Sequence, residues 1–138
     1  MIHLKTDAEI EILRENNILV SRALAEVGKH IRPGITTREL DRIAEDFIRA
    51  NGAEPAFLGY QGYPASACIS VNEQVVHGIP GDRVIEEGDI VSVDLGTFLK
   101  GFVGDSAYTF AVGEVSAEAR QLLEVTKGAL YKGTAQAK

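Results

Sequence analysis

The chain has 138 residues, enough for one domain with a hydrophobic core, and its 45% hydrophobic and 25% charged residues are ordinary for a soluble globular protein. A formal net charge of −6 argues against a surface devoted to binding nucleic acid, and a single cysteine, Cys68, excludes an intrachain disulfide. The N-terminus is too charged for a signal peptide and no apolar run approaches the length of a membrane span, so we expect a cytoplasmic protein with no membrane partner.

Two helices are predicted in the first third of the chain. Residues 6–9 form a capping box, in which side chains satisfy free amides of the first helical turn, and apolar residues follow at helical spacing to about His30. The Arg-Pro-Gly sequence at 32–34 ends this helix. A second capping box at 36–39 begins another helix, which the Asn-Gly pair at 51–52 ends.

The segment 54–64 is rich in glycine, proline and aromatic residues and has no clear period. Such a loop either packs against the surface or forms the wall of a pocket. The aromatic side chains of Phe57, Tyr60 and Tyr63 are compatible with both interpretations.

Short strands are predicted at 67–71 and at 74–77, with a turn between them. Cys68, in the first strand, is interpreted as a small buried apolar residue. His77 ends the second strand, before a Gly-Ile-Pro turn. A histidine in this position either packs against its surroundings or takes part in chemistry.

Residues 90–110 predict a β-hairpin with Lys100-Gly101 at its centre and one aspartate, Asp94 or Asp105, in each strand. A turn at 99–100 would place the two aspartates directly opposite each other. A turn at 100–101 would make them diagonal neighbours on the same face. Either two-residue turn brings their Cβ atoms to roughly 5–8 Å, whereas a three-residue turn would place them on opposite faces.

Two carboxylates this close in an apolar sheet are unfavourable unless a proton or a cation lies between them. The pair therefore favours a divalent metal site. The alternative is that Asp94 and Asp105 are ordinary surface residues on a half-solvated hairpin. Beside a paired-aspartate hairpin, a functional role for His77 becomes the favoured interpretation.

Ser116 can cap a third helix from Ala117 to about Ala137, which reaches the C-terminus without a stop signal. The order is two helices, an antiparallel β core and a helix. This order predicts an α+β fold in a single α/β unit over residues 1–138.

Three stretches of the chain resemble type I methionine aminopeptidase: LGYQGYPASACISVNEQVVHGIPGDR, EGDIVSVDLG and GFVGDSAYTFAVGEVS. The resemblance covers essentially the whole chain. It implies the N-terminal half of a pita-bread (creatinase/aminopeptidase) fold, with an antiparallel sheet and helices packed on one face. In this fold two α/β halves enclose two divalent metal ions, which are Co, Mn, Fe, Zn or Ni.

The resemblance also implies roles for particular residues. Asp94 matches the first metal ligand and Asp105 the carboxylate that bridges both metals. His77 matches the residue that contacts substrate and stabilises the developing negative charge. The positions that line the pocket for the methionine side chain are matched by Phe57, Tyr60, Tyr63 and Cys68.

Family members continue into a second half that supplies a histidine and two glutamates to the metal site. The resemblance therefore implies an N-terminal half that is inactive alone, whose partners are the missing C-terminal half and N-terminal Met peptides of nascent proteins. The alternatives are a non-catalytic partner-binding module and an isolated folding unit of the same fold. An uncovered strand edge and apolar wall would also predict a homodimer through the exposed face.

Overall fold

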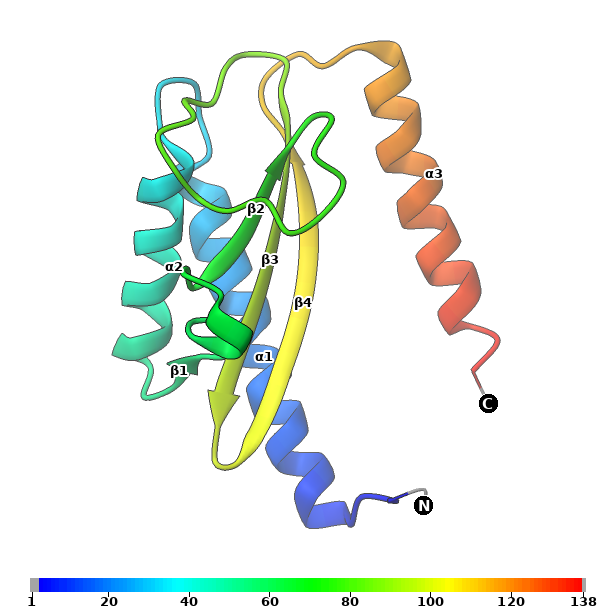
Figure 1. Ribbon diagram of the computed structural model, residues 1–138. Coiled ribbons are helices and arrows are strands. Elements are labelled where there is room, and N and C mark those ends of the chain that lie inside the picture. The colour runs from blue at the N-terminus through cyan, green and yellow to red at the C-terminus, as the bar shows by residue number, and fades with distance from the viewer. Residues whose placement is uncertain (1–2, 138) are drawn as a thin grey trace.

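The computed structural model describes residues 3–137, over which three α-helices accompany a four-stranded antiparallel sheet (Figure 1). The helices are α1 (Asp7–His30), α2 (Thr37–Ala50) and α3 (Ala117–Thr134), and a short 3₁₀ turn, η1, spans Tyr60–Gly62. The strands are β1 (Glu54–Pro55), β2 (Ala67–Val71), β3 (Ile90–Leu99) and β4 (Phe102–Ala111). The prediction of one unit over 1–138 includes Met1, Ile2 and Lys138, which lie outside the described residues, and it stays a prediction.

β3 is the central strand of the sheet. It pairs on one side with β4 along its whole length, and on the other side with β2 and the two-residue β1. Alternate residues of β3 are fully buried, and these include Val91, Val93 and Leu95. They point to the layer formed by α1 and α2; in Figure 1, α1 runs behind the sheet and α2 stands to its left. The other face of β3 carries no helix, and Asp94 lies on it.

The core between sheet and helices is entirely aliphatic at its centre. Its fully buried members come from both helices and from the sheet: Val20, Val27, Leu40, Ile48, Val71, Val91, Val93 and Leu95. This arrangement confirms the predicted α+β fold with an antiparallel sheet and helices packed on one face. Within residues 3–137, no helix is long and apolar enough to cross a membrane.

α3 differs from the other two helices because none of its residues is buried. It begins where the Ser116 cap predicts, and it ends at Thr134 rather than near Ala137. Figure 1 shows it standing beside the sheet, away from the α1–α2 layer. Large apolar side chains on it are more than half exposed: Leu122, Val125, Leu130 and Tyr131.

The hairpin turn is Lys100-Gly101, and both residues have positive φ (51° and 85°), as a type I′ turn requires. Leu99 therefore pairs with Phe102, and Gly96 pairs with Asp105. Of the three turns that the sequence left open, the structure has the one in which Asp94 and Asp105 are diagonal neighbours on the same face.

A buried polar contact joins α1 to this hairpin. Asn16, which is 0% exposed, donates through Nδ2 to the carbonyls of Thr97 (3.2 Å) and Phe102 (2.7 Å). The hydroxyl of Thr97, also 0% exposed, donates to Asn16 Oδ1 at 2.6 Å. Gly104 permits the close approach, since a Cβ atom there would lie 2.9 Å from the Asn16 carbonyl oxygen. The contact fixes α1 at one position along the hairpin.

The predicted strand at residues 74–77 is wrong. Gln74 instead closes a turn on Val71: its amide donates to the Val71 carbonyl (3.2 Å) and its Oε1 accepts from the Val71 amide (3.0 Å). Val75 and Val76 are 86% and 64% exposed, and His77 has a positive φ of 58°. The Val-Val pair has no sheet neighbour within residues 3–137, so the β propensity of two valines alone did not produce a strand.

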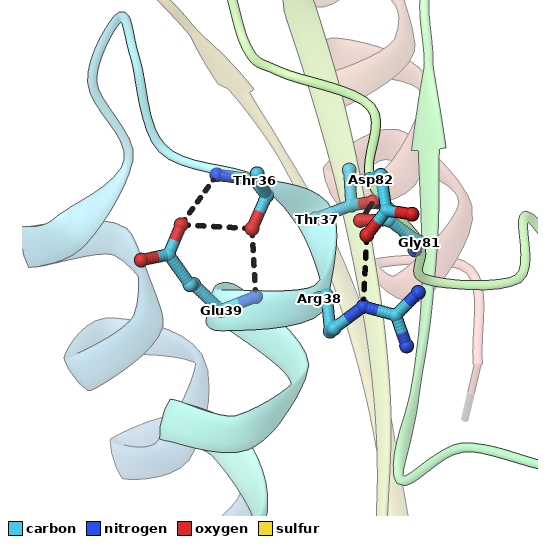
Figure 2. Close-up of polar contacts among 6 residues, drawn as sticks. All are labelled: Thr36, Thr37, Arg38, Glu39, Gly81 and Asp82. Atoms are coloured by element: carbon cyan, nitrogen blue, oxygen red, sulfur yellow. Dashed lines mark hydrogen bonds and ion pairs between the residues drawn. The ribbon is translucent and has the colours of Figure 1, made fainter.

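The far end of this loop is anchored on the N-terminus of α2 (Figure 2). The predicted capping box at 36–39 is formed, and the next residues hold the loop. The Thr37 hydroxyl contacts the Gly81 carbonyl (3.0 Å) and amide (2.9 Å), and the Arg38 amide donates to the same carbonyl. Arg38 also pairs with Asp82 at 3.1 Å. The segment that carries His77 therefore begins and ends at fixed points.

Candidate metal and substrate site

Asp94 is the most unusual polar residue of the open face. Its Oδ1 atom is buried and has no hydrogen-bond partner within the described residues. Burial raises the pKa of Asp94, the negative charge of Asp105 raises it further, and the positive charge of His77 partly offsets both effects. A buried carboxylate oxygen without a partner is destabilising by roughly 1–3 kcal/mol.

A divalent cation would remove this penalty, because a hard cation prefers carboxylate oxygens as ligands. Asp105, exposed on the same face, is placed to share it. The two aspartates therefore fit a metal ion. No group of three or more His, Cys, Asp or Glu side chains suited to a metal occurs in residues 3–137, so these residues supply only part of a complete ligand set.

His77 is exposed on the loop between β2 and β3. It is close enough to the aspartate pair for its charge to affect Asp94. Gly78, directly after it, is buried against β2, and a Cβ atom there would clash with the Ile69 carbonyl. The structure therefore places Asp94 and Asp105 on the same face of the hairpin and His77 within electrostatic range of Asp94.

The predicted pocket residues have different surroundings. Phe57 packs on the hairpin beside Asp94, since a Cβ atom at Gly96 would lie 2.6 Å from its ring. Tyr63 is half-buried, and its hydroxyl donates to backbone carbonyls. Tyr60 is 67% exposed, and within residues 3–137 its hydroxyl accepts only from the neighbouring Gln61 (3.3 Å). Its place in a methionine pocket stays a prediction.

Cys68 is buried and pairs with Asp94 across β2 and β3. Burial raises the pKa of its thiol, with a smaller contribution from Asp94 and Asp105. A thiol in this state is a poor nucleophile. This agrees with the interpretation of Cys68 as a small packing residue beside the site.

Two further carboxylates support the site, and sequence reasoning missed them. Asp41 Oδ1 accepts the amides of Ser66 (3.0 Å) and Ala67 (2.8 Å), and Glu45 accepts the Ser66 hydroxyl (3.0 Å). They fix the start of β2, and with it Cys68. The one signal in the sequence is their i, i+4 spacing on α2, which ordinary solvent-facing residues share.

Comparison with known proteins identifies the family. Residues 11–138 match metallopeptidase family M24. The chain belongs to this family. Methionine aminopeptidase 1 of Bacillus subtilis (strain 168) is 53% identical to this M24 chain over 138 residues, which are 100% of the chain and 56% of the relative. Methionine aminopeptidase of Clostridium acetobutylicum is 51% identical, over 99% of the chain and 55% of the relative.

A solved structure gives the same result. The crystal structure of methionine aminopeptidase from Rickettsia prowazekii matches with a TM-score of 0.94 at 36% identity, covering 96% of this chain and 54% of that one. These similarities confirm the predicted resemblance and fold. The M24 chain spans about half the length of the relatives it matches. Membership of a metallopeptidase family also implies a divalent metal cofactor, in agreement with the donors on the open face.

Proposed function

We propose that this chain forms part of a methionine aminopeptidase, which removes the N-terminal methionine of newly made polypeptides in the cytoplasm. The observation that carries the proposal is the buried, unpartnered Oδ1 of Asp94 beside Asp105. The two relatives described above are methionine aminopeptidases, which supports an N-terminal methionine as the substrate.

In this proposal Asp94 and Asp105 hold two divalent metal ions together with ligands from outside the chain. A divalent metal, when bound, activates water and polarises the scissile carbonyl, which is worth several kcal/mol. His77 contacts the substrate and stabilises the negative charge that develops on it. Phe57, Tyr63 and Cys68 form the wall of the methionine pocket, and Tyr60 forms its rim.

The bare apolar side of α3 favours association with a further polypeptide. We propose that a C-terminal half of an M24 enzyme covers it and supplies the missing ligands. Without that half, the chain is an inactive folding unit or a partner-binding module. A homodimer through a different surface, the exposed strand edge and the apolar wall around Phe57, Tyr60 and Tyr63, stays a prediction, which sedimentation velocity with and without Mn²⁺ tests.

The chain alone is expected to release no methionine from a Met-Ala-Ser peptide above the background of metal alone, because its ligand set is incomplete. Adding the remaining, unmatched segment of the Bacillus subtilis relative should restore release. Methionine is measured by chromatography. Turnover by the chain alone at enzyme-like rates, on the order of 1–10³ s⁻¹, would contradict the incomplete site. No release with the added segment would contradict the proposed function.

Mn²⁺ should bind the chain weakly, and the double variant Asp94→Asn/Asp105→Asn should lose this binding. Two carboxylates without further ligands give a weak and unselective site. Isothermal titration calorimetry measures it. The control is Glu118→Gln/Glu124→Gln, which removes the same two negative charges from exposed positions on α3 and should bind as the wild type does. Tight binding of two ions by the chain alone would mean that further ligands exist within it.

A further inference from the structure

Gly78 is the point at which the His77 loop is attached to β2. Its carbonyl accepts the Ile69 amide (2.8 Å) and the Tyr63 hydroxyl (3.2 Å), and its amide donates to the Ser70 hydroxyl (3.0 Å). These contacts come from two parts of the chain: Ile69 and Ser70 lie in β2, and Tyr63 directly follows η1. The position of the residue before Gly78 therefore depends on both.

His77 itself has little else to hold it. Its side chain is exposed and makes no hydrogen bond within residues 3–137. Its φ of 58° lies in the left-handed region, which is unfavourable by about 1–3 kcal/mol for a residue other than glycine. A strained backbone persists only when neighbouring contacts stabilise it. The hydrogen bonds of Gly78, the next residue along the chain, provide this stabilisation for His77.

Tyr63 is suited to such a role. Its hydroxyl lies between the carbonyls of Ala67 (3.0 Å) and Gly78 (3.2 Å) and so links the start of β2 to the His77 loop. Burial raises the pKa of Tyr63 well above its usual value, and the Cys68 thiol adds to the shift. The hydroxyl therefore remains a protonated donor at neutral pH.

We propose that the Tyr63 hydroxyl is a positioning group for His77. It fixes the Gly78 carbonyl and thereby keeps the adjacent His77 backbone in the left-handed conformation that sets where the imidazole lies. This role is separate from the pocket wall that the aromatic ring provides. The hydrogen bond from the Tyr63 hydroxyl to the Gly78 carbonyl, called the tether below, is present in the chain itself. Only the catalytic role of His77 rests on the proposed function.

The test is amide hydrogen exchange by NMR on the chain carrying Tyr63→Phe, which keeps the ring and removes the donor. The Ile69 and Gly78 amides should exchange about tenfold faster, as expected for the loss of one net hydrogen bond. The Val93 amide, in the core of β3, should not change, and the ring-proton resonances of His77 should shift.

Tyr60→Phe is the matched control. It removes a hydroxyl from the same loop, but that hydroxyl accepts only from Gln61, so the Ile69 and Gly78 amides and the His77 resonances should stay as in the wild type. Unchanged exchange and unchanged His77 resonances in Tyr63→Phe would overturn the proposal. So would equal changes in Tyr60→Phe.

Ser70→Ala is a second, independent test of the proposal. It remains informative even if rapid exchange of the Val93 amide shows that the Tyr63→Phe variant does not fold. It removes the partner of the Gly78 amide but leaves the Tyr63 contact. The Gly78 amide should lose protection while the Ile69 amide keeps it. Loss of protection at Ile69 as well would show that Tyr63 does not hold the Gly78 carbonyl, and the proposal would fail. If these amide results hold but methionine release is never restored, the proposed function fails and the tether stands.

Discussion

His77→Ala should lower kcat for methionine release about 10²–10³-fold in the chain complemented with a C-terminal half, with Mn²⁺ binding unchanged. Removing one donor that stabilises developing negative charge typically has an effect of this size. His77 is exposed on the loop between β2 and β3 and acts electrostatically on Asp94, which is compatible with contact to a substrate bound at the aspartate pair. It is not one of the two carboxylates that would hold the metal.

Steady-state kinetics with a Met-Ala-Ser peptide measure the first effect, and isothermal titration calorimetry measures metal binding. The matched control is His30→Ala. His30 ends α1, is exposed and has Glu26 (3.4 Å) as its only polar side-chain partner within residues 3–137, so its loss should leave kcat unchanged. If metal binding falls in parallel with kcat in His77→Ala, the assignment of His77 to the substrate is wrong.

Asn16→Ala should lower the free energy of unfolding by about 3 kcal/mol, because it removes the buried side chain that accepts from the Thr97 hydroxyl and donates to the carbonyls of Thr97 and Phe102. Each buried polar group that loses its partner is destabilising by roughly 1–3 kcal/mol. The change also removes the contact that fixes α1 along the β3–β4 hairpin.

Urea unfolding monitored by circular dichroism measures this effect. Asn17→Ala is the control: the neighbouring side chain is exposed and donates only to the Leu13 carbonyl of its own helix (2.8 Å), so a change within about 0.5 kcal/mol is expected. An effect of Asn16→Ala as small as that of Asn17→Ala would show that the buried network contributes little to stability.

Local chemistry in the sequence determined where the regular elements begin and turn. The capping boxes at 6–9 and 36–39 predicted α1 and α2, and both boxes are formed. The cap at Ser116 predicted the start of α3, and Lys100-Gly101 predicted the hairpin. In each case residues within four positions satisfy one another's hydrogen bonds or permit a positive φ, so no distant part of the chain is needed.

The sequence also predicted the residues of the candidate site, through residue types and their resemblance to methionine aminopeptidase, and their roles stay predictions. It left open whether the turn lay at 99–100 or 100–101, because both registers place Asp94 and Asp105 on one face. Pairing along all of β3 and β4 decides for the diagonal arrangement. The contact of Asn16 with Thr97 and Phe102 agrees with it.

Only the tertiary structure decided what the remaining polar and apolar residues do. Val75 and Val76 are β-branched residues that favour a strand, but Gly78, two residues further on, holds the chain on β2 in another conformation. Asn16 and Asp41 look like solvent-facing helix residues, yet they bind the hairpin and the start of β2. Their partners lie 25 to 86 positions away. Local patterns carry no information about which distant backbone groups need a partner, so contacts of this kind become visible only when the chain is folded.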